Sequence, residues 1–206
     1  MKKGLIIGLG ILGFLAFMIF TLASWVMGSY NNMVTLNQGV EKVWGDVETA
    51  YQRRSDMIPN LMQTTKGYAE HEKGTFTAVT EARAKVGQIK LSANDLTPEN
   101  LAKFNAAQGE LSSALSKLMM IKEAYPELKA DKLFVRLMDE VAGTENRINV
   151  ARQRYNETAQ EYNVTIKRFP GMLIAGFFNF KEKPYFKSEA GSEKAPKIDF
   201  STPSGK

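Results

Sequence analysis

The chain has 206 residues, with 27 Lys and Arg against 22 Asp and Glu, one histidine and no cysteine. This length predicts one domain, or one domain with an appendage. The lack of cysteine excludes a disulfide scaffold, an iron–sulfur cluster, a thiolate zinc site and a cysteine nucleophile. Residues 4–28 carry no charged side chain, so the composition predicts a membrane segment joined to a polar body.

The excess positive charge lies in the carboxyl-terminal part of the chain. Residues 167–206 hold eight Lys and Arg and four Asp and Glu, whereas residues 1–166 hold 19 and 18. A nucleic-acid-binding protein concentrates its cations on one face or groove. We therefore predict a solvated tail and no nucleic-acid partner, with contact between the tail lysines and anionic lipid as the alternative.

Residues 4–28 read GLIIGLGILGFLAFMIFTLASWVMG. This stretch exceeds the about 20 apolar residues that a helix needs to cross a bilayer, and the about 7–15 of a cleaved signal peptide. Trp25 and Tyr30 lie at its far end, where amphipathic rings favour the lipid–water boundary. The sequence predicts a membrane anchor over residues 1–29, with a transmembrane helix at about residues 4–28 and the lipid bilayer as a partner.

The flanking cations predict the orientation of this helix. Lys2 and Lys3 lie on its short side, whereas Lys42 is the only cation on the other side before Arg53. Lysine and arginine beside a span tend to stay in the cytoplasm. We therefore expect the amino terminus inside and the following domain outside.

A narrow apolar seam follows the anchor. Apolar residues recur at 3–4 spacing from Met33 to Tyr68, with Arg54 as the charged exception, and this pattern indicates a long helix. Pro59 lies inside this helix and cannot donate a backbone hydrogen bond. We therefore expect a kink or a short break between Asp56 and Pro59.

Two further boundaries are marked by local signals. The apolar pattern resumes at Phe76 and predicts a second helix that ends near Lys90. Thr97 followed by Pro98 predicts the start of a third helix, because threonine caps a helix and proline fits its first position. Pro126 disfavours helical geometry at the residue before it, so this helix is expected to end there.

The most regular pattern spans residues 130–168. Large side chains such as Ile148 and Tyr155 alternate with small ones such as Ala151 and Thr158 along one seam. The helix is expected to be about 58 Å long, and such a helix buries its stripe only against other long helices. The sequence thus predicts an all-α chain, with an N-terminal transmembrane helix followed by an elongated antiparallel bundle of long helices over residues 30–170.

Several blocks of the chain carry a family resemblance. They are Tyr30-Asn31, Trp44, RRSDMIPNLMQTTKGYAEHEKGTFTAVTEAR from Arg53, AYPELKA from Ala124, TENRINVARQRYNETAQEYN from Thr144, FPG from Phe169 and APKIDF from Ala195. In this order they resemble the LemA family of bacterial membrane proteins. The resemblance implies a single-pass protein of the bacterial cytoplasmic membrane with a helical-bundle domain. It implies no established catalytic activity and, for some members, an association with membrane proteases or stress systems.

His71 is the only histidine and the natural candidate for a general base or a metal ligand. Glu70 and Glu72 flank it, but neighbours in a helix point to different sides. A metal site needs three or four converging groups, and the chain has no phosphate-binding loop, nucleophile motif or paired-acid motif. We expect a structural or surface role for His71, and no catalytic residue, cofactor or metal. An unrecognised hydrolase built from several helices stays an alternative.

The more informative cluster holds two arginines, an acid and an amide: Arg53, Arg54, Asp56 and Asn60. An arginine at a seam position must pair with a carboxylate or extend past its neighbours. One interpretation of Arg54 is a recognition point for a partner. The favoured one is an internal salt bridge to Glu145 or Glu157 that sets helix register. We interpret the Tyr-Asn pairs at residues 30, 155 and 162 as core aromatics beside polar register residues.

The tail, residues 171–206, holds five aromatic residues within ten positions: Phe177, Phe178, Phe180, Tyr185 and Phe186. Aromatic side chains at this density need a dry surface. We expect the segment to fold back over the bundle. Docking on a neighbouring subunit or on the lipid surface are the alternatives.

These features favour a non-enzymatic, membrane-anchored scaffold that self-associates through its helical bundle. Confinement to a membrane raises the effective concentration of the chains and so promotes a homo-oligomer. The alternative is an adaptor or regulator of a membrane protease or stress-response system, in which Arg53, Arg54, His71 and the tail contact the partner.

Overall fold

The computed structural model describes residues 2–68 and 70–187. These residues form no strand. The helices are α1 (Lys2–Thr64), α2 (Lys73–Gln88), α3 (Pro98–Ala124), α4 (Pro126–Ala130), α5 (Lys132–Lys167) and α6 (Gly171–Phe177), with 3-10 turns η1 (Lys66–Tyr68) and η2 (Ala93–Asp95). The predicted all-α fold is confirmed.

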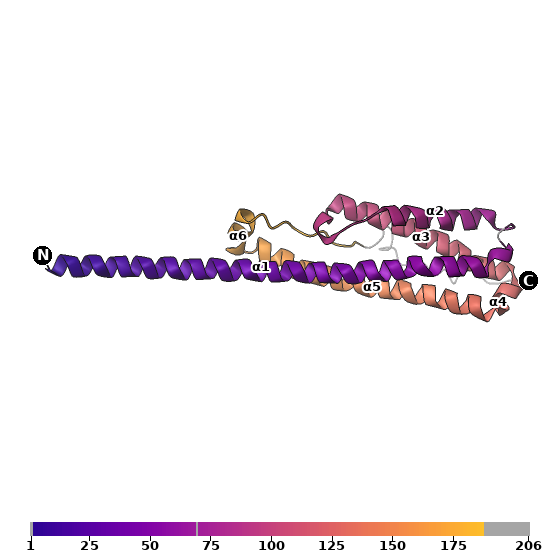
Figure 1. Ribbon diagram of the computed structural model, residues 1–206, viewed down its shortest axis with the longest axis horizontal. Helices are drawn as coiled ribbons and strands as arrows, with labels where there is room; N and C mark the ends of the chain where they lie inside the picture. The colour runs from indigo at the N-terminus through magenta and orange to yellow at the C-terminus, as the bar shows by residue number, and fades with distance from the viewer. Residues whose placement is uncertain (1, 69, 188–206) are drawn as a thin grey trace, which may run out of the picture.

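Two long helices form the axis of the molecule. α1 has 63 residues and α5 has 36, and the two run antiparallel along each other. The α2–α3 hairpin lies along this pair, and α1 continues well beyond the bundle on its amino-terminal side (Figure 1). The predicted elongated bundle of long helices is therefore confirmed.

The part of α1 outside the bundle is apolar and exposed. Its large side chains from Ile6 to Phe20 are 46% to 69% exposed. α1 is long and apolar enough to cross a membrane and lies near the amino terminus. It is therefore compatible with a single-pass membrane anchor. The orientation of this anchor stays a prediction.

Two apolar clusters fill the bundle. The first, next to the exposed part of α1, joins α1 to α5, α6 and the segment after α6, and Trp44 and Tyr155 are its largest members. The second joins the distal halves of α1 and α5 to α2, α3 and α4, around Ile58, Leu118 and Phe134. The predicted seam of α1 therefore supplies both clusters.

Local signals position the ends of the helices. The Oγ1 atom of Thr97 accepts a hydrogen bond from Asn100 N at 3.2 Å, with Pro98 in the first turn, as predicted. α3 ends at Ala124, directly before Tyr125 and Pro126. Oδ1 of Asp131 caps α5 by accepting hydrogen bonds from the next turn. These caps satisfy backbone N–H groups that have no partner within the helix.

Of the kink or short break expected between Asp56 and Pro59, the break is wrong, because α1 continues without interruption to Thr64, and the kink stays a prediction. A proline removes the hydrogen bond to the carbonyl four residues earlier, here that of Ser55. Nε of Arg83, on α2, donates to this Ser55 oxygen at 3.3 Å. The buried side chains of Ile58 and Leu61 hold the helix on both sides of the proline. Tertiary contacts therefore maintain the helix where its own ladder is incomplete.

The chain reverses after α6. A Cβ atom at Gly171 would lie 2.8 Å from the Thr165 carbonyl oxygen and 3.1 Å from Cε of Met33, so only glycine permits this approach. At the other end, Phe180 N donates to Ala175 O at 2.9 Å, and Asn179 has a φ of 59°. This pattern is the Schellman motif with asparagine in the left-handed position. It directs residues 180–187, which we call the strap, back along α5.

Candidate functional site

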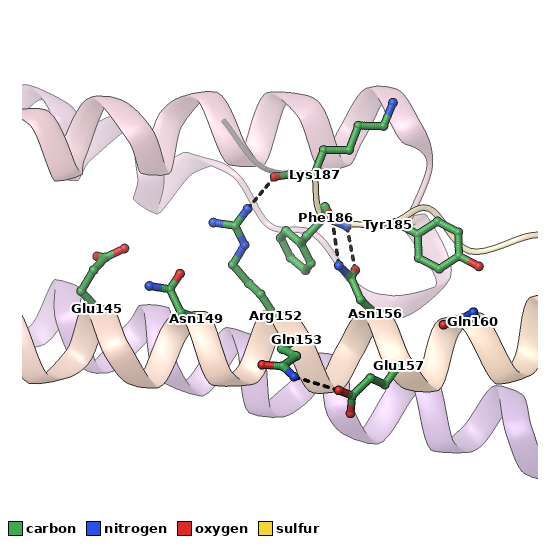
Figure 2. A pocket seen from close by; sticks show the side chains of 10 residues that line it. All are labelled: Glu145, Asn149, Arg152, Gln153, Asn156, Glu157, Gln160, Tyr185, Phe186 and Lys187. Carbon is green, nitrogen blue, oxygen red and sulfur yellow. Dashed lines mark hydrogen bonds between the residues drawn. The ribbon is translucent and has the colours of Figure 1, made fainter. Parts of the chain in front are cut away.

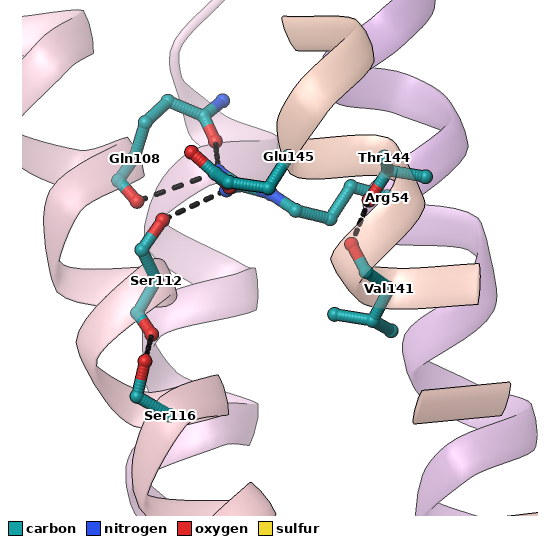
Figure 3. Close-up of polar contacts among 7 residues, drawn as sticks. All are labelled: Arg54, Gln108, Ser112, Ser116, Val141, Thr144 and Glu145. Atoms are coloured by element: carbon teal, nitrogen blue, oxygen red, sulfur yellow. Dashed lines mark hydrogen bonds and ion pairs between the residues drawn. The ribbon is translucent and has the colours of Figure 1, made fainter. Parts of the chain in front are cut away.

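Arg54 is buried between three helices, with 1% of its surface exposed. Its Nη1 donates to Oε2 of Glu145 at 2.7 Å and to Oγ of Ser112 at 2.8 Å, and its Nη2 donates to Oε1 of Gln108 at 2.6 Å. Figure 3 shows these acceptors arriving from α3 and α5 around the guanidinium. The arginine therefore links α1 to both neighbouring helices.

The Arg54 guanidinium is occupied by the bundle itself. Its Cζ lies 5.3 Å from the centre of the Tyr51 ring, and only its Nε, which is buried, lacks an acceptor among the described residues. The Glu145 side chain is 47% exposed, so the ion pair reaches from the core to the surface. Glu157, the other carboxylate considered, accepts from Nε2 of Gln153 instead.

The other three members of the arginine cluster lie on the surface. Arg53, Asp56 and Asn60 are exposed, so they do not meet Arg54 in the core. Asp56 accepts a hydrogen bond from Nε2 of Gln52 at 2.7 Å. Arg53 and Asp56, together with Glu48, line an open depression of about 570 Å³ on the surface of α1, and Asn60 lies outside its lining.

His71 is exposed at the distal end of the bundle. Glu70, His71 and Glu72 lie in a turn between η1 and α2, and not in the helix expected from the sequence. Glu72 accepts from the Tyr125 hydroxyl at 3.3 Å, across the turn. Within residues 2–68 and 70–187, no three His, Cys, Asp or Glu side chains are grouped so that they could hold a metal ion.

The strap is held to α5 by its backbone. Nδ2 of Asn163 donates to the Lys183 carbonyl at 2.8 Å, and Oδ1 of Asn163 accepts from the Lys183 N–H at 2.9 Å. Asn156 forms the same reciprocal pair with Phe186, at 2.9 Å and 2.8 Å. The Tyr155 hydroxyl donates to the Pro184 carbonyl between these two pairs, and the Tyr162 hydroxyl donates to the Lys181 carbonyl before them. The Tyr-Asn pairs on α5 are therefore the groups that bind the strap.

The spacing of these pairs matches the two backbones. Asn156 and Asn163 are one heptad apart, which is about 10.5 Å along an α-helix. Lys183 and Phe186 are three residues apart, which is about 10 Å along an extended chain. Successive asparagines on one face of α5 therefore meet every third residue of the strap. Binding through the backbone requires no particular strap side chain.

Phe186 and Phe180 attach the strap to the bundle through their rings. Phe186 is 6% exposed and stacks on Trp44 with ring centres 6.1 Å apart, next to Tyr155 at 5.3 Å. Phe180, half-buried, lies 5.7 Å from the ring of Tyr30. The tail thus folds back over the bundle at these two positions.

The other tail aromatics remain at the surface. Phe177 and Phe178 are 84% and 44% exposed, and Tyr185 is 37% exposed. Phe178 lies 4.7 Å from the ring of Tyr30, on the part of α1 nearest the apolar span. The part of the tail from residue 188 onwards, including the APKIDF block, lies outside the described residues.

An open groove of about 660 Å³ runs along α5 beside the strap (Figure 2). Arg152 crosses it, with Nη2 donating to the Lys187 carbonyl at 3.0 Å and Cζ 4.9 Å from the Phe186 ring centre. Asn149 lies in the groove one heptad before Asn156, and its side chain forms no hydrogen bond with another described residue. The groove presents amides and charges of both signs on the outer side of α5.

Burial alters the ionisation of the groups around the strap. It raises the pKa values of the Tyr155 and Tyr162 hydroxyls, with a smaller contribution from Tyr185 to the pKa of Tyr155. Burial also lowers the pKa of Lys183, which Glu41 partly offsets. The Nζ of Lys183 donates to the Ala93 carbonyl at 3.2 Å. These three groups lie where the strap contacts the bundle.

The sequence matches a known protein family. The sequence profile of the LemA family matches residues 43–200, which include the Arg54 cluster, the α5 seam and the strap. The chain belongs to the LemA family. This confirms the resemblance found in the sequence.

Individual relatives of this LemA-family chain are distant. It is 25% identical over 181 residues to Magnetosome protein MamQ 2 of Paramagnetospirillum magneticum, covering 80% of this chain and 66% of that protein. It is 28% identical over 174 residues to Magnetosome protein MamQ of Magnetospirillum gryphiswaldense, covering 76% and 64%. It is also 25% identical over 171 residues to Protein LemA of Metamycoplasma hominis, covering 82% and 74%. The matches to the MamQ proteins span just under two thirds of their length.

Proposed function

We propose that this LemA-family protein is a non-enzymatic, membrane-anchored scaffold that self-associates through the outer face of α5. The observation that carries the proposal is a second 3–4 row on this helix, outside the bundle. The row consists of Val150, Gln153, Glu157, Gln160 and Val164. A 3–4 row is the pattern by which helices pack along each other.

The residues at the two ends of this row are apolar and exposed. Val150 and Val164 are 42% and 43% exposed, although valine is a residue of helix–helix contacts rather than of hydrated surfaces. They are two heptads apart and therefore lie on the same side of α5. A second long helix placed along the row would bury both valines and the amides between them.

The charges of the neighbouring groove suit contact between identical chains. Its lining includes two acids, Glu145 and Glu157, and two cations, Arg152 and Lys187. A two-fold contact requires a surface that is complementary to itself. Acids and cations in equal number allow the acids of one copy to face the cations of the other.

Cysteine cross-linking tests this contact directly, since the natural chain has no cysteine. Gln153→Cys and Gln160→Cys place single thiols on the row, and Lys117→Cys places one on the exposed surface of α3. A short bismaleimide in native membranes is expected to give covalent dimers for the first two variants and not for the third. Monomers for all three, or equal dimer yields, would contradict the proposal.

The depression on α1 favours the second candidate function, that of an adaptor for a membrane protease or stress-response system. Arg53 and Asp56, both exposed, line it together with Met57. A photoreactive residue at position 53 distinguishes the two functions. A scaffold is expected to cross-link mainly to itself, whereas an adaptor is expected to cross-link to one dominant membrane protein of another kind.

We further propose that the bundle lies outside the bacterial cytoplasmic membrane, which the cations Lys2 and Lys3 before the apolar span support. The Lys117→Cys variant tests this orientation as well. A membrane-impermeant maleimide is expected to label it in cells whose cytoplasmic membrane is intact. Labelling only after the membrane is broken would place the bundle in the cytoplasm.

A further inference from the structure

Helix α6 has an apolar outer face at the end of the bundle from which the exposed part of α1 emerges (Figure 1). Its sequence, GMLIAGF, contains no charged or hydrogen-bonding side chain. Ile174 and Ala175 are buried, whereas Met172, Leu173 and Phe177 are 52%, 63% and 84% exposed. A helix at a water-exposed surface carries polar residues on its outer face. The composition of α6 therefore does not fit contact between its outer face and water.

The patch continues on both sides of α6. Phe169, just before the helix, is 72% exposed, and Phe178, just after it, is 44% exposed. Five large apolar side chains thus gather within ten residues of one another at one end of the bundle. Exposed apolar groups at this density mark a contact with another apolar phase.

Three contacts place α6 at the level of residues 26–33 of α1. The rings of Phe178 and Tyr30 lie 4.7 Å apart. A Cβ atom at Gly171 would lie 3.1 Å from Cε of Met33. Val26 packs against the core cluster that includes Ile174. Helix α6 is therefore level with the carboxyl-terminal end of the apolar part of α1.

This level corresponds to the surface of a membrane crossed by α1. The exposed apolar side chains of α1 begin at Ile6 in the described surface, and about 20 helical residues cross the hydrocarbon. The hydrocarbon then ends near Trp25, and residues 26–33 lie in the headgroup region. Helix α6 lies beside that region, and the exposed cations Arg168 and Lys181 flank it. Cations at this depth are favoured by anionic headgroups.

We propose that α6 inserts its outer face into the lipid interface beside the transmembrane helix, so that the bundle contacts the bilayer at a second place. Lipid is the occupant because the patch is continuous with the apolar surface of α1 and ends where that surface ends. Met172, Leu173 and Phe177 enter the boundary between headgroups and acyl chains, and the buried face of α6 keeps its contacts with the bundle. Two points of contact restrict the tilt of the bundle relative to the membrane.

Three methionines of similar exposure provide a matched test. Met172 is 52% exposed on α6, Met18 is 51% exposed within the apolar span, and Met120 is 63% exposed on α3. Each is changed to cysteine in the full chain, which has no other thiol, and labelled with an environment-sensitive fluorophore. The labelled proteins are reconstituted into vesicles of phosphatidylcholine and phosphatidylglycerol that contain lipids with a nitroxide at a shallow or a deep acyl position.

The shallow nitroxide is expected to quench the label at Met172 by at least half, and more than the deep one does. The label at Met18 is expected to respond more to the deep nitroxide, and that at Met120 to neither. A label at Met172 that responds only to an aqueous quencher would overturn the proposal. A label at Met172 that neither the lipid nitroxides nor the aqueous quencher reaches, with energy transfer between labelled chains, would also overturn the proposal. That result would show that a second copy of the chain covers α6. Phe177→Cys repeats the measurement if the label at position 172 lowers helicity.

Discussion

The Arg54 guanidinium is buried, whereas the Glu145 carboxylate that binds it at 2.7 Å is 47% exposed. The two charged groups therefore differ in whether they can reach water when the other is removed. Glu145 can turn to water, but Arg54 remains enclosed by the bundle. A buried charge without its partner costs more free energy than an exposed one.

We predict that Glu145→Ala destabilises the bundle by about 2 kcal/mol, whereas Arg54→Met costs less than about 1 kcal/mol. Methionine fills the apolar part of the arginine site without introducing a charge, and the groups that lose a donor at Ser112 and Gln108 are themselves neutral. Urea unfolding of the full chain in mild detergent, followed by circular dichroism, measures both changes. An equal loss of unfolding free energy in the two variants, or a greater loss in Arg54→Met, would contradict this difference between Glu145 and Arg54.

The contact between Arg83 and Ser55 predicts a coupling with Pro59. Arg83→Ala is expected to cost up to about 1 kcal/mol in the natural chain, because the Ser55 carbonyl loses its donor. In a Pro59→Ala background the backbone N–H of residue 59 supplies this hydrogen bond, so the same change is expected to cost nothing measurable. A double-mutant cycle of unfolding free energies checks this. An additive cycle would show that Arg83 does not compensate for the proline.

The reciprocal hydrogen bonds of Asn163 with Lys183 are expected to slow hydrogen exchange of the strap backbone. Asn163→Ala leaves the N–H and carbonyl of Lys183 without partners in a buried place, at a cost of about 2 kcal/mol. Hydrogen exchange at residues 183–186 is expected to accelerate at least tenfold. Asn149→Ala is the matched control, since the side chain of Asn149 forms no hydrogen bond with another described residue. Unchanged exchange in Asn163→Ala would indicate that other contacts hold the strap.

The tyrosines at the strap predict a loss of stability at alkaline pH. Burial raises the pKa values of Tyr155 and Tyr162 above the ordinary value of 10.0. Above that pH the unfolded chain releases protons that the native chain keeps, so stability falls by at most about 1.4 kcal/mol per pH unit and tyrosine. Lys183 acts in the opposite direction, because burial lowers its pKa and the unfolded chain binds its proton more tightly.

Urea midpoints between about pH 10 and pH 11.5 measure this balance. The natural chain is expected to lose stability across the interval, because the buried tyrosines keep protons that the unfolded chain has released. The opposing contribution of Lys183 is complete once the pH exceeds the ordinary lysine pKa of 10.5. Tyr155→Phe is expected to be less stable than the natural chain at the lower pH, because it lacks the hydrogen bond to the Pro184 carbonyl. Its free energy of unfolding is expected to fall less than that of the natural chain as the pH rises. A parallel decline in both proteins would exclude Tyr155 as a cause.

The helices and their ends follow from local signals in the sequence. Thr97 and Pro98 begin α3, and Pro126 follows its end, because capping and proline geometry involve neighbouring residues only. The uninterrupted course of α1 past Pro59 does not follow from such signals. It depends on Arg83, which is distant in the sequence and adjacent only after folding.

The sequence indicates two possible carboxylate partners for Arg54, Glu145 and Glu157, and does not decide between them. Glu145 and Glu157 both lie on the same long helix, and the choice depends on how α1 and α5 align. That alignment is set by contacts along their whole length, such as the approach of Gly39 to Thr158. Sequence periodicity defines a face of a helix, but not its position along another helix.

The strap and α6 were harder to predict than the bundle. The Tyr-Asn repeat on α5 was recognised, but its partner is the backbone of the strap, which has no side-chain pattern. α6 has seven residues, and this length is too short for a helical period to appear. The aromatic density near Phe177 indicated a contact in this region without specifying its geometry.

Identical chains of this protein are expected to associate in the membrane. Photobleaching of a carboxyl-terminal fluorescent tag on single nanodiscs extracted from native membranes counts the subunits in each assembly. Most discs are expected to bleach in two or more steps, and Gln153→Glu with Gln160→Glu is expected to shift them to one step. A single step in nearly all discs of the natural chain, at the natural expression level, would show that the chains do not associate.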